Sequence, residues 1–143
     1  MEPSSSLHVV CAHCLATNRV PAARLANDPI CGRCGKELLD GRPVELTDKN
    51  FDTVTSRTEL PVLVDFWASW CGPCLAMAPQ FERAAQQLKG RALFAKVDSD
   101  RNPQIAGRFA IRSIPTLVRI ESGRERARQT GALQAAQIVA FAG

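Results

Sequence analysis

The segment Trp70-Cys71-Gly72-Pro73-Cys74 constrains the fold of this 143-residue chain more than any other. It follows directly on an apolar run at 62–68 that is typical of a buried strand. If a helix begins at this point, its free N–H groups and positive dipole end would stabilise the thiolate of Cys71. Cys74, deeper in the helix, would stay protonated. The pattern therefore predicts a dithiol that cycles with a disulfide, in which Cys71 attacks and Cys74 resolves.

Strands and helices alternate on both sides of this segment, which predicts an α/β fold: a central mixed sheet flanked by helices. The dithiol would then lie at the carboxyl end of a central strand, where open α/β sheets usually carry their sites. A turn at 121–124 predicts that the last two strands form a hairpin. The expected strands are 44–46, 62–67, 92–97, 116–120 and 125–129, and the expected helices are 48–56, 71–88, 103–109 and one from Ala132.

A second cysteine pattern lies upstream. Two C-x-x-C motifs are separated by sixteen residues, and the second contains Gly32 and is followed by Gly35, which permit tight backbone turns. This spacing is typical of a zinc ribbon with one structural zinc held by four thiolates. A module of about forty residues cannot bury enough apolar surface to fold alone, so the metal would supply most of its folding free energy. The expected ligands are Cys11, Cys14, Cys31 and Cys34.

Two alternatives stay open for this module. His13 could replace one cysteine as a metal ligand, or the four cysteines could form two disulfides or remain free thiols. Disulfides would require an oxidising compartment.

With its remaining motifs the chain resembles the zinc-containing bacterial thioredoxins, in which a short zinc module precedes a thioredoxin domain. The match to the thioredoxin domain runs from Val44 to Phe141. The resemblance implies a thioredoxin fold and the activity of a protein-disulfide reductase. The motifs that carry it besides the dithiol are Asp65 within its strand, Lys96-Val97-Asp98, Ser113-Ile114-Pro115-Thr116 and Gly131-Ala132-Leu133.

The resemblance also implies roles around the dithiol. Pro115 would have a cis peptide bond and face the cysteines, leaving the backbone at Ile114 free to pair with an extended substrate. Trp70 would cover the dithiol and contact substrate together with Gly72 and Pro73. An ordinary trans proline at the start of a strand is the alternative for Pro115.

Asp65 stands between apolar residues on a strand that should be buried, a costly place for a carboxylate without a role or partner. By resemblance it would accept the proton of Cys74 through a water, with Lys96 as its charged neighbour. Burial should raise the pKa of Asp65 and Lys96 should oppose that rise. The alternative is a strand-end aspartate that reaches solvent or caps a helix.

The implied partners are disulfide-containing proteins and an NADPH-dependent thioredoxin reductase. The chain has no Gly-rich dinucleotide fingerprint, so no bound organic cofactor is expected. A disulfide oxidase or isomerase, and a redox-sensing holdase that releases zinc, are the alternative functions. On a working reductase, the zinc module could also be regulatory and not only structural. Leu75 stands where thioredoxins commonly carry Lys and Ser113 where Gly is frequent, which bears on substrate preference.

We expect a disordered tail at 1–8, the zinc ribbon at 9–40 and the thioredoxin domain at 41–143, in a monomer. No apolar signal region follows Met1 and no run of about eighteen apolar residues occurs, so we expect a cytoplasmic protein that does not enter membranes.

Charge argues against binding to nucleic acid. Residues 1–40 hold four basic and four acidic side chains, and four thiolates with one divalent metal would add about −2 to the net charge of +4. The only basic cluster is Arg124, Arg126 and Arg128, which alternate on an expected edge strand. A solvated face explains them best, and steering of acidic partners is the alternative.

Overall fold

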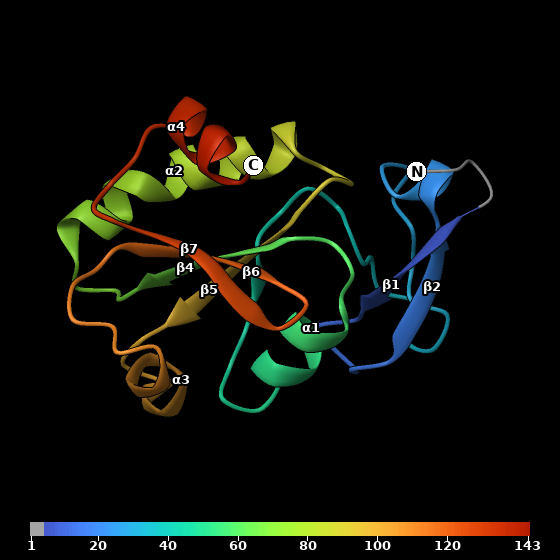
Figure 1. Ribbon diagram of the computed structural model, residues 1–143, viewed down its shortest axis with the longest axis horizontal. Coiled ribbons are helices and arrows are strands. Elements are labelled where there is room, and N and C mark those ends of the chain that lie inside the picture. Colours follow the sequence, from blue (N-terminus) through green and yellow to red (C-terminus); the bar gives the residue numbers. More distant parts are fainter. Residues whose placement is uncertain (1–4) are drawn as a thin grey trace.

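The computed structural model, which describes residues 5–143, contains a small hairpin and a larger five-stranded sheet (Figure 1). In the hairpin, β1 (Ser6–Val10) pairs antiparallel with β2 (Thr17–Pro21), and a short 3-10 helix, η1 (Ala22–Arg24), follows. The larger sheet has the order β3-β5-β4-β6-β7. Its strands are β3 (Val44–Glu45), β4 (Val62–Trp67), β5 (Leu93–Asp98), β6 (Thr116–Glu121) and β7 (Arg124–Thr130).

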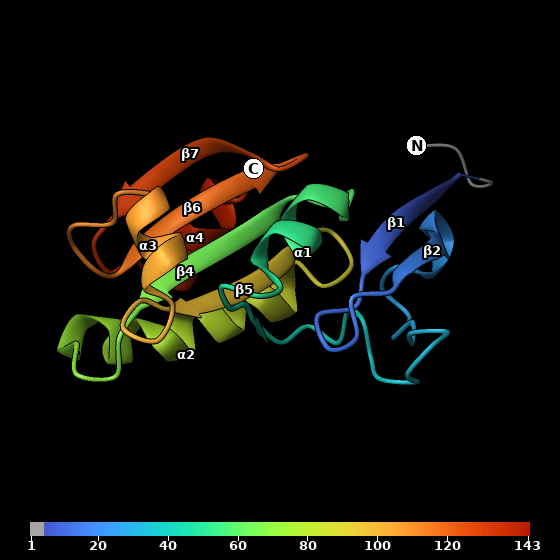
Figure 2. The same ribbon diagram turned by 90° about the horizontal axis from the view of Figure 1, so that it is seen from below.

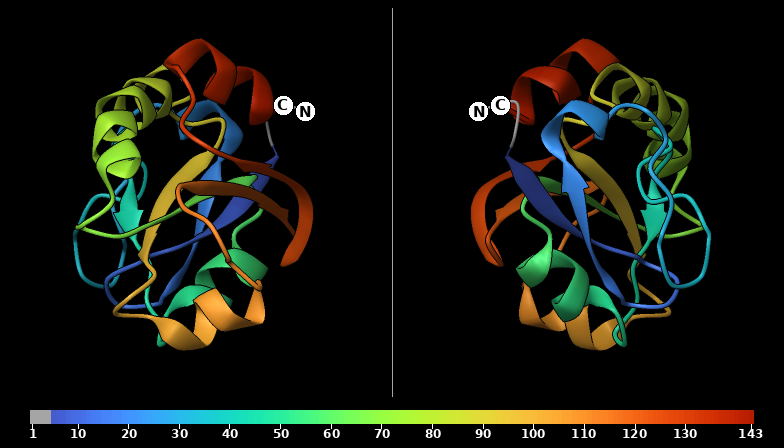
Figure 3. Two further views of the ribbon diagram at one scale, coloured as in Figure 1. Left: turned by 90° about the vertical axis from the view of Figure 1, so that its left-hand side faces the viewer. Right: turned by 90° about the vertical axis from the view of Figure 1, so that its right-hand side faces the viewer.

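The larger sheet is mixed and covered on both faces. β3, β5 and β4 run parallel, whereas β6 and β7 are antiparallel to their neighbours. Helices α2 (Gly72–Gln87) and α4 (Ala135–Phe141) cover one face, and α1 (Phe51–Arg57) and α3 (Pro103–Arg108) the other (Figures 1 and 3). This confirms the expected mixed sheet flanked by helices, with the dithiol segment after a central strand.

Successive side chains of β4 point to opposite faces of the sheet, so they pack into two different parts of the hydrophobic core. Val62, Val64 and Phe66 pack in the cluster that contains residues of α1 and α3, while Leu63 packs against α2 and α4. Asp65 has the same parity as Leu63. Its side chain therefore lies on the α2 side of the sheet.

The N-terminal module shares a hydrophobic core with the sheet. Buried side chains of the module, among them Val9, Val20 and Leu38, belong to the same cluster as Phe51 and Val54 of α1. The sequence predicts two separate modules, and nothing in the local pattern of either one indicates this common core. The module is therefore stabilised by packing as well as by the metal that its cysteines would bind.

Polar contacts reinforce this junction. The backbone N–H of Glu59 donates to the carbonyl of His8 at 2.8 Å, and the His8 N–H donates to the Glu59 carboxylate at 2.6 Å. After the end of α2, Lys89 pairs with Asp28 at 2.6 Å. The ribbon module is thus fixed to α1 and to the C-terminal end of α2, far from the N-terminus of α2 (Figure 2).

The predicted elements of the larger domain all occur, with shifts of a few residues at their ends. The strand at 62–67 and the 121–124 turn are as expected, whereas α1 and α4 each begin three residues late. The predicted tail at 1–8 is wrong from Ser6 onward, because those residues belong to β1; residues 1–4 lie outside the described part of the chain. No helix within residues 5–143 is long and apolar enough to cross a membrane.

Candidate active site and metal centre

Cys71 and Cys74 form a disulfide at the start of α2. Cys71 is the N-cap residue of α2, and its sulfur accepts the backbone N–H of Cys74 at 3.2 Å. Gly72 and Pro73 open the helix, where a proline N–H would have no partner in any case. Both cysteines are buried, with 4% and 2% of their surface exposed. The free N–H groups of the helix therefore face the sulfur expected to attack.

The loop before β6 closes the other side of this pair. The Ile114–Pro115 peptide bond is cis, as the resemblance implied. The Ile114 carbonyl oxygen lies 3.7 Å from the Cys71 sulfur. Thr116 fixes the loop by donating its hydroxyl to the Ser113 carbonyl at 2.7 Å. The backbone at Ile114 is thus positioned directly beside the dithiol.

Asp65 lies behind the site, fully buried on β4. Neither of its carboxylate oxygens has a hydrogen-bond partner among the described residues. Burial raises the pKa of Asp65 to about 7, and the positive charge of Lys96 opposes this rise. Lys96 is its register partner on β5, and the Lys96 ammonium lies 4.5 Å from the centre of the Trp67 ring. The carboxyl group can therefore take up or release a proton near neutral pH.

Two exposed apolar side chains flank the buried cysteines in sequence and form a rim beside them. Trp70 is 70% exposed and Leu75 is 52% exposed. The Trp70 indole N–H donates to the Asp100 carboxylate at 2.7 Å, which holds the ring in place at the surface. Such a rim can bind a partner's apolar side chains beside its disulfide.

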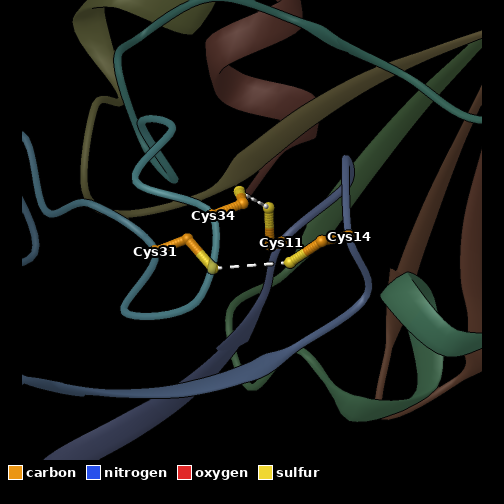
Figure 4. A group of neighbouring side chains, drawn as sticks. All are labelled: Cys11, Cys14, Cys31 and Cys34. Carbon is orange, nitrogen blue, oxygen red and sulfur yellow. Dashed lines mark hydrogen bonds between the residues drawn. The ribbon is translucent and has the colours of Figure 1, made fainter.

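The four upstream cysteines converge into one cluster, shown in Figure 4. Their sulfur atoms all lie within 4.8 Å of one another. Cys11 and Cys34 have sulfurs 3.6 Å apart, and those of Cys14 and Cys31 are 3.5 Å apart. These pairs are free thiols, so the two-disulfide alternative does not describe this structure. His13 is exposed and not part of the cluster.

Matching backbone turns carry the two halves of this cluster. In the first half, the Cys11 N–H donates to the Ala16 carbonyl, and the Cys11 carbonyl accepts the Leu15 N–H. The same two hydrogen bonds join Cys31 to Lys36 and to Gly35 in the second half. Leu15 and Gly35 occupy equivalent positions in the two turns, and both have a positive φ, 65° and 78°. Glycine adopts such a conformation without the cost that Leu15 bears.

The cluster fits a tetrahedral metal site. Sulfurs at about 2.3 Å from a zinc ion are separated by somewhat under 4 Å, close to the distances between the paired sulfurs. Burial raises the pKa of Cys11 to about 11, so at neutral pH its thiolate requires a neighbouring cation. Hydrogen bonds from the Cys34 backbone and the Asn18 side chain lower the pKa of Cys31 to about 6. The donor set is therefore suited to a metal ion that binds thiolates.

Residues 42–143 match the family profile described as Thioredoxin. The chain belongs to the thioredoxin family. Residues 10–36 match the profile described as Thioredoxin 2, N-terminal, a zinc ribbon. The chain is therefore a thiol-disulfide oxidoreductase of this family, a protein-disulfide reductase with an N-terminal metal-binding module.

Individual relatives agree with this assignment. Thioredoxin C-3 of Corynebacterium nephridii is 47% identical over 91% of this chain and 89% of its own length. Thioredoxin 2 of Chlorobaculum tepidum is 42% identical over 66% of this chain and 87% of its own. Among solved structures, chloroplastic thioredoxin z aligns with a TM-score of 0.65 and 31% identity, covering 71% of this chain and 91% of that chain.

Two polar residues of these sites do not appear among the sequence predictions. Asn18 bridges the cluster: its side-chain oxygen accepts the Gly32 N–H at 2.9 Å, and its amide nitrogen lies 3.5 Å from the Cys31 sulfur. Asp100 anchors Trp70. Asn18 stands on β2 between the two cysteine pairs, where no spacing rule marks it. Asp100 follows Lys96-Val97-Asp98 by two residues, which is its only sequence signal.

Proposed function

We propose that this thioredoxin reduces protein disulfides through attack by Cys71. The observation that carries the proposal is the position of Cys71 at the N-cap of α2, with its sulfur beside the cis Ile114–Pro115 backbone. The helix N-terminus stabilises the attacking thiolate, and the backbone of Ile114 beside it pairs with an extended substrate. Trp70, Gly72 and Pro73 form the rest of the substrate-contacting surface.

The reaction proceeds by two exchanges. The Cys71 thiolate attacks one sulfur of the substrate disulfide; a mixed disulfide forms, and the other substrate sulfur leaves as a thiolate. Cys74 then loses its proton and attacks the Cys71 sulfur, which releases the second substrate thiol. The substrate gains two electrons, and the Cys71–Cys74 pair is left as a disulfide.

Asp65 accepts the proton that Cys74 loses in the second exchange. Its burial and its pKa of about 7 support this role, since a base of that pKa can both take and return the proton near neutral pH. Lys96 assists by keeping the pKa from rising further. A thioredoxin reductase that draws electrons from NADPH then restores the dithiol.

The four-cysteine cluster binds one zinc ion in a structural role, within a module spanning residues 9–40. Four protein thiolates leave no open position for water or substrate on the metal. The cluster's module meets α2 at its C-terminal end, while Cys71 lies at its N-terminus, about 24 Å away for 16 residues at 1.5 Å each. That separation argues against direct exchange between the ribbon thiols and Cys71. Zinc thiolates and a recycling dithiol both suit the reducing cytoplasm, where we expect a monomer.

The decisive experiment measures the rate at which a protein disulfide is reduced, with thioredoxin reductase and NADPH as the source of electrons. It compares the zinc-loaded wild type with the zinc-loaded Cys71→Ser variant. Ala76→Ser, an exposed hydroxyl addition on the same helix, is the matched control. Rapid turnover by wild type and control, abolished in Cys71→Ser, is expected. Full activity of Cys71→Ser would exclude the mechanism. Absence of turnover in folded wild type would favour the oxidase or zinc-releasing sensor.

A further inference from the structure

A hollow of about 670 Å³ lies between α2 and the segment that joins the ribbon module to β3. Its walls come from three parts of the chain: the joining segment, the exposed side of α2, and Lys96 on β5. This volume is within the range of about 300–1,000 Å³ typical of small-molecule sites. The lining residues are Gly41, Arg42, Pro43, Pro79, Glu82, Arg83, Gln86 and Lys96.

The hollow carries an excess of positive charge. Three cationic side chains, Arg42, Arg83 and Lys96, line it against the single carboxylate of Glu82. Within residues 5–143, none of the three cations forms an ion pair. Other arginines of the chain do pair, as Arg108 with Asp52 and Arg128 with Glu125. Lys96 also interacts electrostatically with the buried Asp65. The three cations still outnumber the carboxylates of Glu82 and Asp65, and this excess of positive charge attracts an anion from solution.

The side chains favour a phosphate group over a carboxylate. Two guanidinium groups can each donate paired hydrogen bonds to phosphate oxygens, and a lysine ammonium adds a compact positive charge. The Gln86 amide can donate as well. Three cations from separate elements match an anion with several charges better than one with a single charge.

This hollow is separate from the dithiol surface. Pro79, Glu82 and Gln86 stand 8 to 15 residues after Cys71, which places them about 12–22 Å along α2 from the helix N-terminus. An anion in the hollow would leave Trp70 and the cis loop free for a protein substrate. It would lie against Lys96, the register partner of Asp65.

We propose that this hollow binds a small polyvalent phosphate anion, and that Arg42, Arg83 and Lys96 are its ligands. The site is distinct from the dithiol and from the cysteine cluster. It does not depend on which cysteine attacks the substrate.

The test is a titration of the zinc-loaded, oxidised protein with pyrophosphate, followed by amide NMR shifts at constant ionic strength. Constant ionic strength removes general screening as a cause of shifts. Saturable shifts centred on residues 41–43, 82–86 and 96 are expected. Shifts that are linear in concentration, or spread over all basic surfaces, would overturn the proposal.

Two variants and one control make the test specific. Arg83→Gln and Arg42→Gln should each weaken pyrophosphate binding about tenfold, because each removes one guanidinium ligand. Arg126→Gln on β7, an exposed arginine at the opposite edge of the sheet, should leave binding unchanged. Equal affinity in all three variants, or a loss only in Arg126→Gln, would refute the site. All three positions are exposed, so the folded state is retained.

Discussion

Replacing Asp65 with Asn should make stability less dependent on pH. The carboxyl has a pKa of 3.8 when unperturbed and about 7 in the folded protein, because burial disfavours its charged form. Below pH 3.8 Asp65 is protonated in both the folded and the unfolded state, and it does not affect the free energy of unfolding. Between pH 3.8 and 7 the unfolded state loses this proton more readily, so the free energy of unfolding falls as pH rises, and above pH 7 it falls no further. Asn cannot ionise, so Asp65→Asn escapes this penalty.

The magnitude follows from the two pKa values. At pH 8 the full shift applies, 7 minus 3.8, or about 4 kcal/mol at 1.36 kcal/mol per pKa unit. At pH 5 only the interval from 3.8 to 5 applies, which amounts to less than about 2 kcal/mol. The unfolding free energy of Asp65→Asn, minus that of wild type, should therefore rise by roughly 2 to 3 kcal/mol between pH 5 and pH 8.

The assay is urea unfolding of both proteins at pH 5, 6, 7 and 8. The proteins should be zinc-loaded and oxidised, so that Cys71 and Cys74 do not titrate and metal effects cancel in the difference. Fixed differences between an amide and a carboxyl in the same site also cancel, because they are equal at every pH. A difference that stays constant from pH 5 to pH 8 would refute a raised pKa at Asp65.

Three further perturbations test other parts of the structure. Cys74→Ser should accumulate mixed disulfides with protein substrates, visible by non-reducing mass spectrometry, and free turnover in this variant would contradict its resolving role. Removal of the metal by a chelator should release one zinc per chain and lower the unfolding temperature; unchanged melting would show that packing alone supports the ribbon. Gly90→Ala should destabilise by about 2–4 kcal/mol in urea unfolding, since φ is +79° and the added Cβ would lie 2.8 Å from the Ala26 backbone. Gly123→Ala, at φ +77° with its nearest neighbour at 3.4 Å, is the control and should lose only about 1 kcal/mol.

Local patterns predicted the dithiol, the cysteine cluster and β4, because each is written within a few consecutive residues or a fixed spacing. The late start of α4 is also explained locally: Gln134 is the N-cap residue, and its backbone N–H donates to the Gln137 side-chain oxygen at 2.9 Å, so the helix begins after it. The predicted start at Ala132 did not take this N-terminal contact into account.

The remaining features depend on contacts between distant parts of the chain. The predicted tail at 1–8 includes the first three residues of β1, which is held by pairing with β2 and by contacts with residues 58–59, far away in the sequence. Asn18 reaches the cysteine cluster from β2 across 13 residues of sequence. The shared core combines residues of both modules, and the basic hollow combines residues 41–43 with α2 and Lys96 on β5, so neither follows from any single window of sequence.

The common core of the ribbon and the sheet has a consequence for the cell. Because Val9, Val20 and Leu38 pack with residues of the catalytic domain, metal bound by the ribbon favours the folded form of the whole chain. Availability of the metal would therefore influence how much intact reductase a cell maintains. Scarcity of the metal would then act through the number of folded molecules, with the dithiol of each folded molecule unaltered.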